Sequence, residues 1–117
     1  MNPRIYIAGP YTKGDVAENV RRAIFAGEKA RALGFTVFVP HLYHFWHFLS
    51  PHEYQYWMDL DLEWLRTCHV LLRLEGESSG AEIEIGECVK YGIDVVYSEA
   101  EAKEWISDWR ARKAAAL

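Results

Sequence analysis

Short apolar runs alternate with longer segments of helical periodicity along this chain, and that alternation limits its fold more than any other feature. Four runs have the composition of buried strands, at residues 4–8, 35–39, 69–74 and 93–97. Strands separated by helices pair in parallel through right-handed crossovers. We therefore predict one domain over residues 1–117. The predicted fold is a small doubly wound α/β sandwich, flavodoxin- or Rossmann-like, with a four- to five-stranded parallel sheet.

Local signals predict where the helices begin and end. Gly34 and Gly92 follow the first and third helical segments, where glycine commonly ends a helix. Residues 40–49 are rich in aromatic side chains and histidine, and we predict a loop there. Each helix is expected to begin behind a capping side chain: Asp15, Ser50, Ser79 and Ser98.

Composition excludes several classes of protein. The net charge is −4 and no Lys/Arg-rich tract occurs, so we expect no binding to polymeric nucleic acid. Neither a signal peptide nor a membrane-spanning run is visible, and we expect a cytoplasmic protein without a membrane partner. Cys68 and Cys88 are expected to be buried free thiols. The high aromatic content, with Trp105 and Trp109 on the last helix, predicts a homo-oligomer, a dimer or higher.

The ends of the strands indicate where a ligand would bind. Doubly wound sheets bind ligands beyond the carboxyl ends of their strands. Gly9 and Tyr11 follow the first strand, and His41 follows the second, so these residues are expected to face one crevice. Thr12 and Lys13 either bind a phosphate in the same turn or belong to a plain connection.

Acidic residues on two predicted helices are candidates for chemistry. Asp61 falls in the middle of an apolar helical face, where an acid is costly unless it is paired or faces a crevice. It is either a structural acid or a proton donor with a raised pKa. On the next helix, Glu82 and Glu84 lie on opposite edges of the apolar stripe, and periodicity does not choose between them.

Three segments resemble the nucleoside 2-deoxyribosyltransferase superfamily, which also contains small nucleotide N-hydrolases. They are IYIAGPY at residues 5–11, DLEWLRTCHVLL at 61–72 and SSGAEIEIGEC at 78–88. The resemblance implies that Glu84 is the nucleophile, that Asp61 is the acid/base residue and that Tyr6 orients Glu84. It further implies that the sugar or its 5′ substituent is lined by Gly9, Ser78 and Gly80.

The implied reaction breaks the N-glycosidic bond of a (2-deoxy)ribonucleoside or its 5′-monophosphate through a covalent glycosyl-Glu intermediate. The glycosyl group then passes to another base or to water, so the enzyme is a transferase or a hydrolase. The alternative is a non-catalytic nucleotide-binding module of the same fold. We expect a small-molecule nucleoside or nucleotide as the partner.

His41, His44 and His47 are spaced three residues apart. Such spacing brings neighbouring ligands toward one metal on a helix, but the predicted loop argues against it. We therefore expect neither a metal nor an organic cofactor. The aromatic residues between the histidines either form a lid that stacks on a base or pack into the core.

Overall fold

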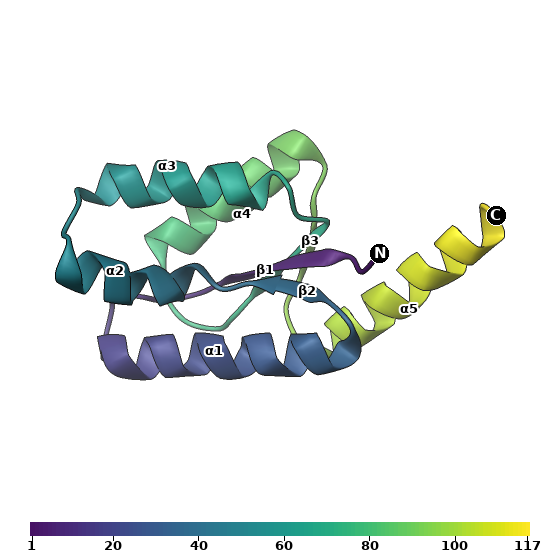
Figure 1. Cartoon of the computed structure of the whole chain (residues 1–117), viewed down its shortest axis with the longest axis horizontal. Helices are drawn as coiled ribbons and strands as arrows, with labels where there is room; N and C mark the ends of the chain where they lie inside the picture. The colour runs from purple at the N-terminus through teal and green to yellow at the C-terminus, as the bar shows by residue number, and fades with distance from the viewer.

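The computed structural model describes residues 1–117 and contains one parallel sheet between two layers of helices (Figure 1). The order β2-β1-β3-β4 is that of a doubly wound sheet, so the predicted fold class is confirmed with four strands. Each strand lies within its predicted run: β1 (Arg4–Ala8), β2 (Thr36–Phe38), β3 (Val70–Arg73) and β4 (Asp94–Val96).

The helices divide between the two faces of the sheet. Helices α1 (Val16–Leu33) and α5 (Glu99–Ala115) contact each other on one face. On the other face α3 (Tyr54–Leu65) contacts α4 (Ser79–Tyr91), and the end of α5 extends away from the body of the domain (Figure 1). No helix is long and apolar enough to cross a membrane.

The alternation of side chains along β1 sorts the core into two clusters. Ile5 and Ile7 face α1 and α5, whereas Tyr6 and Ala8 face α3 and α4, and all four are fully buried. The cluster beneath α3 and α4 also contains both cysteines, which are buried and free as expected. Because a strand has a period of two, Tyr6 can point only toward the α3/α4 layer.

Several predicted helix ends are confirmed. The side chain of Asp15 accepts a hydrogen bond from the Glu18 N–H at 3.2 Å, and Ser98 caps α5 in the same way. Gly34 and Gly92 end α1 and α4 with φ of +107° and +68°, values that glycine adopts without strain.

Three local predictions are wrong. Residues 40–49 are not a loop: they form a turn of 3₁₀-helix, Pro40–Leu42, followed by α2 (Tyr43–Leu49). Pro40 is tolerated there because it stands at the first helical position, where no N–H is needed.

The other two errors concern capping residues. Ser50 ends α2, donating its N–H to the Trp46 carbonyl, and the chain then turns, so α3 begins only at Tyr54. The cap of α4 is Ser78, whose hydroxyl accepts from the Ala81 N–H at 3.1 Å, instead of Ser79. The first of two adjacent serines thus takes the capping position.

Two glycines give a matched test of this packing. A Cβ at Gly9 would lie 2.9 Å from the Cβ of Leu74, whereas a Cβ at Gly86, within α4, meets no atom within 4 Å. We expect Gly9→Ala to lower the free energy of unfolding by about 1–3 kcal/mol. Gly86→Ala should raise it by about 0.5–1 kcal/mol through helix propensity. Urea unfolding of both variants measures this, and equal effects would contradict the packing described here.

Candidate active site

A cavity of about 560 Å³ opens at the carboxyl ends of the strands, beside the point where the sheet order reverses between β1 and β3. Its walls come from the turns after β1, β2 and β3 and from α2, α3 and α4. Nine of the ten predicted site residues line it: Gly9, Tyr11, Thr12, Lys13, His41, Asp61, Ser78, Gly80 and Glu84. The tenth, Tyr6, is fully buried and reaches the cavity through Glu84.

Glu84 lies on α4 with only 6% of its surface exposed. The hydroxyl of Tyr6 donates a hydrogen bond to its Oε2 atom. Glu82, by contrast, lies on the exposed side of α4 and pairs with Arg73 at 3.3 Å. The structure therefore separates the two acids that periodicity left equivalent, since only Glu84 lines the cavity.

Asp61 lines the same cavity from α3. Met58 and Leu65, on the same stripe of the helix, are buried, as the apolar pattern predicts. One carboxyl oxygen of Asp61, Oδ1, is buried and has no hydrogen-bond partner. An acid in that setting favours its protonated form, because the neutral carboxyl costs less to bury than the carboxylate.

Burial raises the pKa of both carboxyl groups. The pKa of Asp61 rises to about 7 for this reason. The pKa of Glu84 rises to about 8, because burial and the charge of Asp61 outweigh the hydrogen bond from Tyr6 and the charge of Arg73, which both lower it. Near neutral pH the pair therefore includes species in which one group is ionised while the other holds a proton. Burial, with the charge of Glu84 second, also raises the pKa of Tyr6 well above its ordinary value.

Arg73, at the end of β3, is a site residue that the sequence reasoning missed. Its guanidinium donates to the carbonyl oxygens of Leu74 and Gly76 and contacts Glu82, so it fixes the turn that leads into α4. Its positive charge also favours the ionised form of Glu84. A charged residue at the carboxyl end of an otherwise apolar strand was the available signal.

The turn after β1 is fixed by hydrogen bonds from Asn19, a buried residue of α1. The Asn19 side-chain amide donates to the carbonyls of Tyr11 and Lys13 at 2.9 and 2.8 Å. Lys13 forms an exposed ion pair with Glu77 at 2.9 Å, which joins the turn after β1 to the turn after β3 at the cavity. A phosphate bound by Lys13 would therefore compete with Glu77.

The histidines near the cavity each have a separate partner. The Nε2 atom of His41 lies 3.1 Å from the carbonyl oxygen of Pro10 and must donate to it, since a carbonyl only accepts. Tyr11 and the Nδ1 atom of His44 are 2.6 Å apart, and Nδ1 of His47 accepts from the indole N–H of Trp57 at 2.8 Å. Nowhere in the chain do three metal-ligating side chains gather around one point.

The aromatic segment divides between cavity and surface, a split that neither the lid nor the core prediction described. Tyr43 lines the cavity, stacked on Trp57 with centroids 5.6 Å apart, whereas Phe45 is exposed. Trp46 is half exposed and contacts Tyr43 and Trp57 with its edge. The sequence reasoning assigned no site role to Tyr54 and Trp57 of α3, which also line the cavity.

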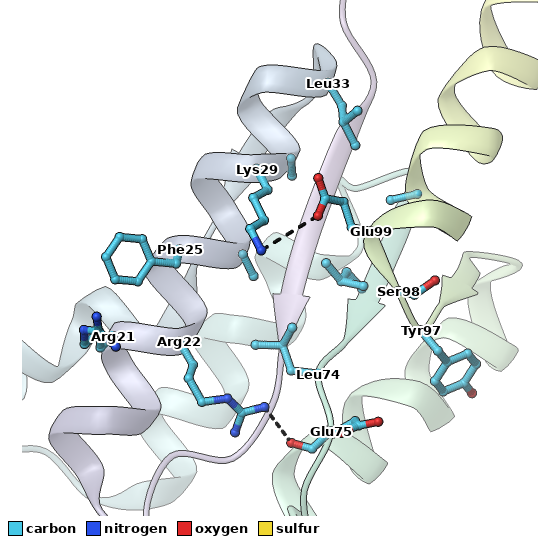
Figure 2. Close-up of a pocket in the computed structure, with 14 residues that line it drawn as sticks. Arg21, Arg22, Phe25, Lys29, Leu33, Leu74, Glu75, Tyr97, Ser98 and Glu99 are labelled. Atoms are coloured by element: carbon cyan, nitrogen blue, oxygen red, sulfur yellow. Dashed lines mark hydrogen bonds and ion pairs between the residues drawn. The ribbon is translucent and has the colours of Figure 1, made fainter.

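A second hollow, of about 380 Å³, lies between α1 and the start of α5 (Figure 2). Figure 2 shows Lys29 directed at Glu99 and Arg22 directed at the backbone of Glu75. The ion pair of Lys29 with Glu99 measures 3.8 Å, and Arg22 donates to the Glu75 carbonyl at 3.1 Å. No buried acid is among the residues that line this hollow. The cavity with Glu84 is therefore the candidate active site.

A doubly wound α/β domain with a buried and a partly buried carboxyl group in one cavity at its switch point is the class that this fold and site define. The chain belongs to the family described as a domain of unknown function (DUF7768), whose model matches residues 3–98. That match covers the sheet, α1 to α4 and every residue of the candidate site. A comparison with curated proteins found no match.

The raised pKa of Glu84 predicts how stability depends on pH. Between the ordinary carboxyl pKa and about 8, folded Glu84 holds a proton that the unfolded chain has released, so stability falls as pH rises through this range. We expect Glu84→Gln to remove about 3 kcal/mol of the decrease between about pH 5 and pH 8. Urea unfolding at both pH values tests this, and an unchanged pH dependence in the variant would contradict it.

The charge of Arg73 gives a second prediction. We expect Arg73→Met to move the pKa of Glu84 to still higher pH, because the variant lacks the positive charge that favours the carboxylate. Arg66→Met is the control. Arg66 pairs at 2.6 Å with Glu87, a different acid of α4, so this variant should leave the pKa of Glu84 unchanged. The pKa of Glu84 is measured by carbon-13 NMR titration of protein labelled at glutamate, and the Glu84 signal is assigned as the one that Glu84→Gln removes. Equal pKa changes in the two arginine variants would refute the role of Arg73.

Proposed function

We propose that this protein cleaves the N-glycosidic bond of a (2-deoxy)ribonucleoside or its 5′-monophosphate. One observation carries the proposal: Glu84 is buried at the cavity with the Tyr6 hydroxyl on its carboxylate, and Asp61 lines the same cavity from another helix. The resemblance of residues 5–11, 61–72 and 78–88 to the nucleoside 2-deoxyribosyltransferase superfamily supports the same roles for these three residues.

In the first step the carboxylate of Glu84 attacks the anomeric carbon, C1′, through an oxocarbenium-like transition state. The bond from C1′ to the base nitrogen breaks as the bond from C1′ to the Glu84 oxygen forms. Asp61 gives its proton to a ring nitrogen of the base, which then leaves as a neutral molecule. In the second step water or another base attacks C1′, Asp61 takes up the proton, and Glu84 is released as a carboxylate.

The first step needs a protonation state that the free protein does not favour by itself, and the charge of the substrate acts toward it. In the free protein the pKa of Asp61 lies slightly below that of Glu84, whereas the first step needs Glu84 ionised and Asp61 protonated. Positive charge that develops at C1′ beside Glu84 favours the carboxylate there. This charge acts in the same direction as the Tyr6 hydrogen bond and the charge of Arg73.

The cavity also suits the size and chemistry of such a substrate. Its volume of about 560 Å³ lies in the range of small-molecule sites, about 300–1,000 Å³. Tyr43, Tyr54 and Trp57 provide flat apolar surfaces on which a base can stack. Ser78, Gly80 and the turn that contains Lys13 lie at the same cavity and are available to the sugar and its 5′ substituent.

Release of free base tests the proposal. The protein is incubated with nucleosides or 5′-monophosphates, with and without a second free base, and the products are separated by chromatography. We expect Glu84→Ala to lower the rate by at least about 1,000-fold and Asp61→Asn by about 100-fold or more, because they remove the nucleophile and the acid. New nucleoside would identify a transferase, and free base alone a hydrolase.

Matched controls are available on the same helices. Glu87→Gln changes an acid on α4 that does not line the cavity, and Asp59→Asn changes an exposed acid of α3. Both variants should retain the wild-type rate. Ligand binding without turnover would favour a nucleotide-binding module, and turnover that survives Glu84→Ala would refute the assigned chemistry.

A further inference from the structure

Helix α2 has two faces with different surroundings. At 100° per residue, Tyr43, His44 and His47 fall on one side, and all three line the cavity. Phe45 and Leu49 fall on the opposite side, with Phe48 and Trp46 on its two flanks, where Trp46 also contacts Tyr43 and Trp57. No residue of α2 is buried. The helix is therefore a cavity wall that protein atoms support from the inner side only.

The outer face of α2 is a large apolar surface. Phe48 and Leu49 are 77% and 83% exposed, and Phe45 is 57% exposed. Together with Trp46 and Leu42, and at about 200 Å² for each large side chain, this face exposes roughly 600 Å². Monomeric proteins seldom expose more than a few hundred Å² of contiguous apolar surface, and one side of a stable protein interface buries about 800 Å².

The charge pattern favours a second copy of the chain over a membrane as the partner of this face. Residues 40–52 contain no Asp, Glu, Lys or Arg, although about a quarter of the chain is charged. Helices that lie on membranes carry Lys or Arg on their polar side, and this chain has a net charge of −4, so an anionic bilayer would repel it. An uncharged apolar face meets no like-charge repulsion when it packs against its own copy.

We propose that two copies of the chain pair through the outer faces of their α2 helices, and that this contact supports the wall of each cavity. Inside the chain α2 is held by side-chain contacts such as the Tyr11–His44 and Trp57–His47 hydrogen bonds. A second copy supplies the missing outer packing. The prediction of an oligomer from the sequence rests partly on the tryptophans of α5, but both make contacts within the chain. Trp105 stacks on Phe35 and donates to Asp94, and Trp109 packs against His69.

Sedimentation velocity over about 1–100 µM protein tests the interface. We expect a dimer for the wild type and at least about a 100-fold weaker dimer for Phe45→Glu and for Leu49→Glu, because each buries an unpaired charge in the contact. Phe25→Glu is the control: Phe25 is 51% exposed on α1 and should leave the dimer unchanged. Because these side chains are exposed, unchanged far-UV circular dichroism is expected for all three variants.

Two results would overturn the proposal. One is a wild-type protein that remains monomeric throughout this range. The other is a wild type that co-sediments with phosphatidylcholine or phosphatidylserine vesicles through Phe45 and Leu49, which would assign the face to a membrane.

The second part of the proposal, that the dimer contact supports the cavity wall, rests on the proposed function and is tested by enzyme kinetics. We expect Phe45→Glu to raise KM for the nucleoside more than it lowers kcat, because Glu84 and Asp61 are untouched. An unchanged KM in a monomeric Phe45→Glu variant would refute the support of the wall but not the interface. A wild-type dimer that releases no base would refute the proposed function and leave the interface standing.

Discussion

The hydrogen bond from Tyr6 to Glu84 is the interaction around which the site is organised. A carboxyl group buried beneath a helix would be costly without a partner, and the Tyr6 hydroxyl supplies one from the centre of the sheet. The two residues meet because of simple periodicities. Alternation along β1 directs Tyr6 toward the α3/α4 layer, and Glu84 shares the inner side of α4 with Ala81 and Cys88, three residues before it and four after it.

Much of the fold follows from patterns that are local in sequence. Strand runs of the right length, the Asp15 and Ser98 caps and the glycines after two helices can each be recognised within a few residues. The segment 40–49 was mispredicted because its helix depends on contacts with Trp57, which no local pattern reveals. A short aromatic segment without charged residues gives little local signal to distinguish a loop from a helix.

The candidate site was predictable to a different degree at each residue. Asp61 stands out in the sequence because an acid interrupts an apolar stripe. Glu84 and Glu82 are equivalent by periodicity, and only the resemblance chose between them before the structure separated them. Arg73 and Asn19 were not predicted because their partners are backbone carbonyls of turns, and every residue has a carbonyl, so the sequence does not show which ones are bound. What sequence cannot supply here is the relative placement of turns.

The two outer strands of the sheet, β2 and β4, are only three residues long. An edge so short offers few free backbone groups to another chain, so it is a poor template for strand-by-strand growth into fibrils. Because the sheet edges are short, contact between molecules through the exposed aromatic residues of α2 does not provide a template for amyloid. Contact between copies of this chain, such as the one proposed for α2, would therefore use side chains and not the edges of the sheet.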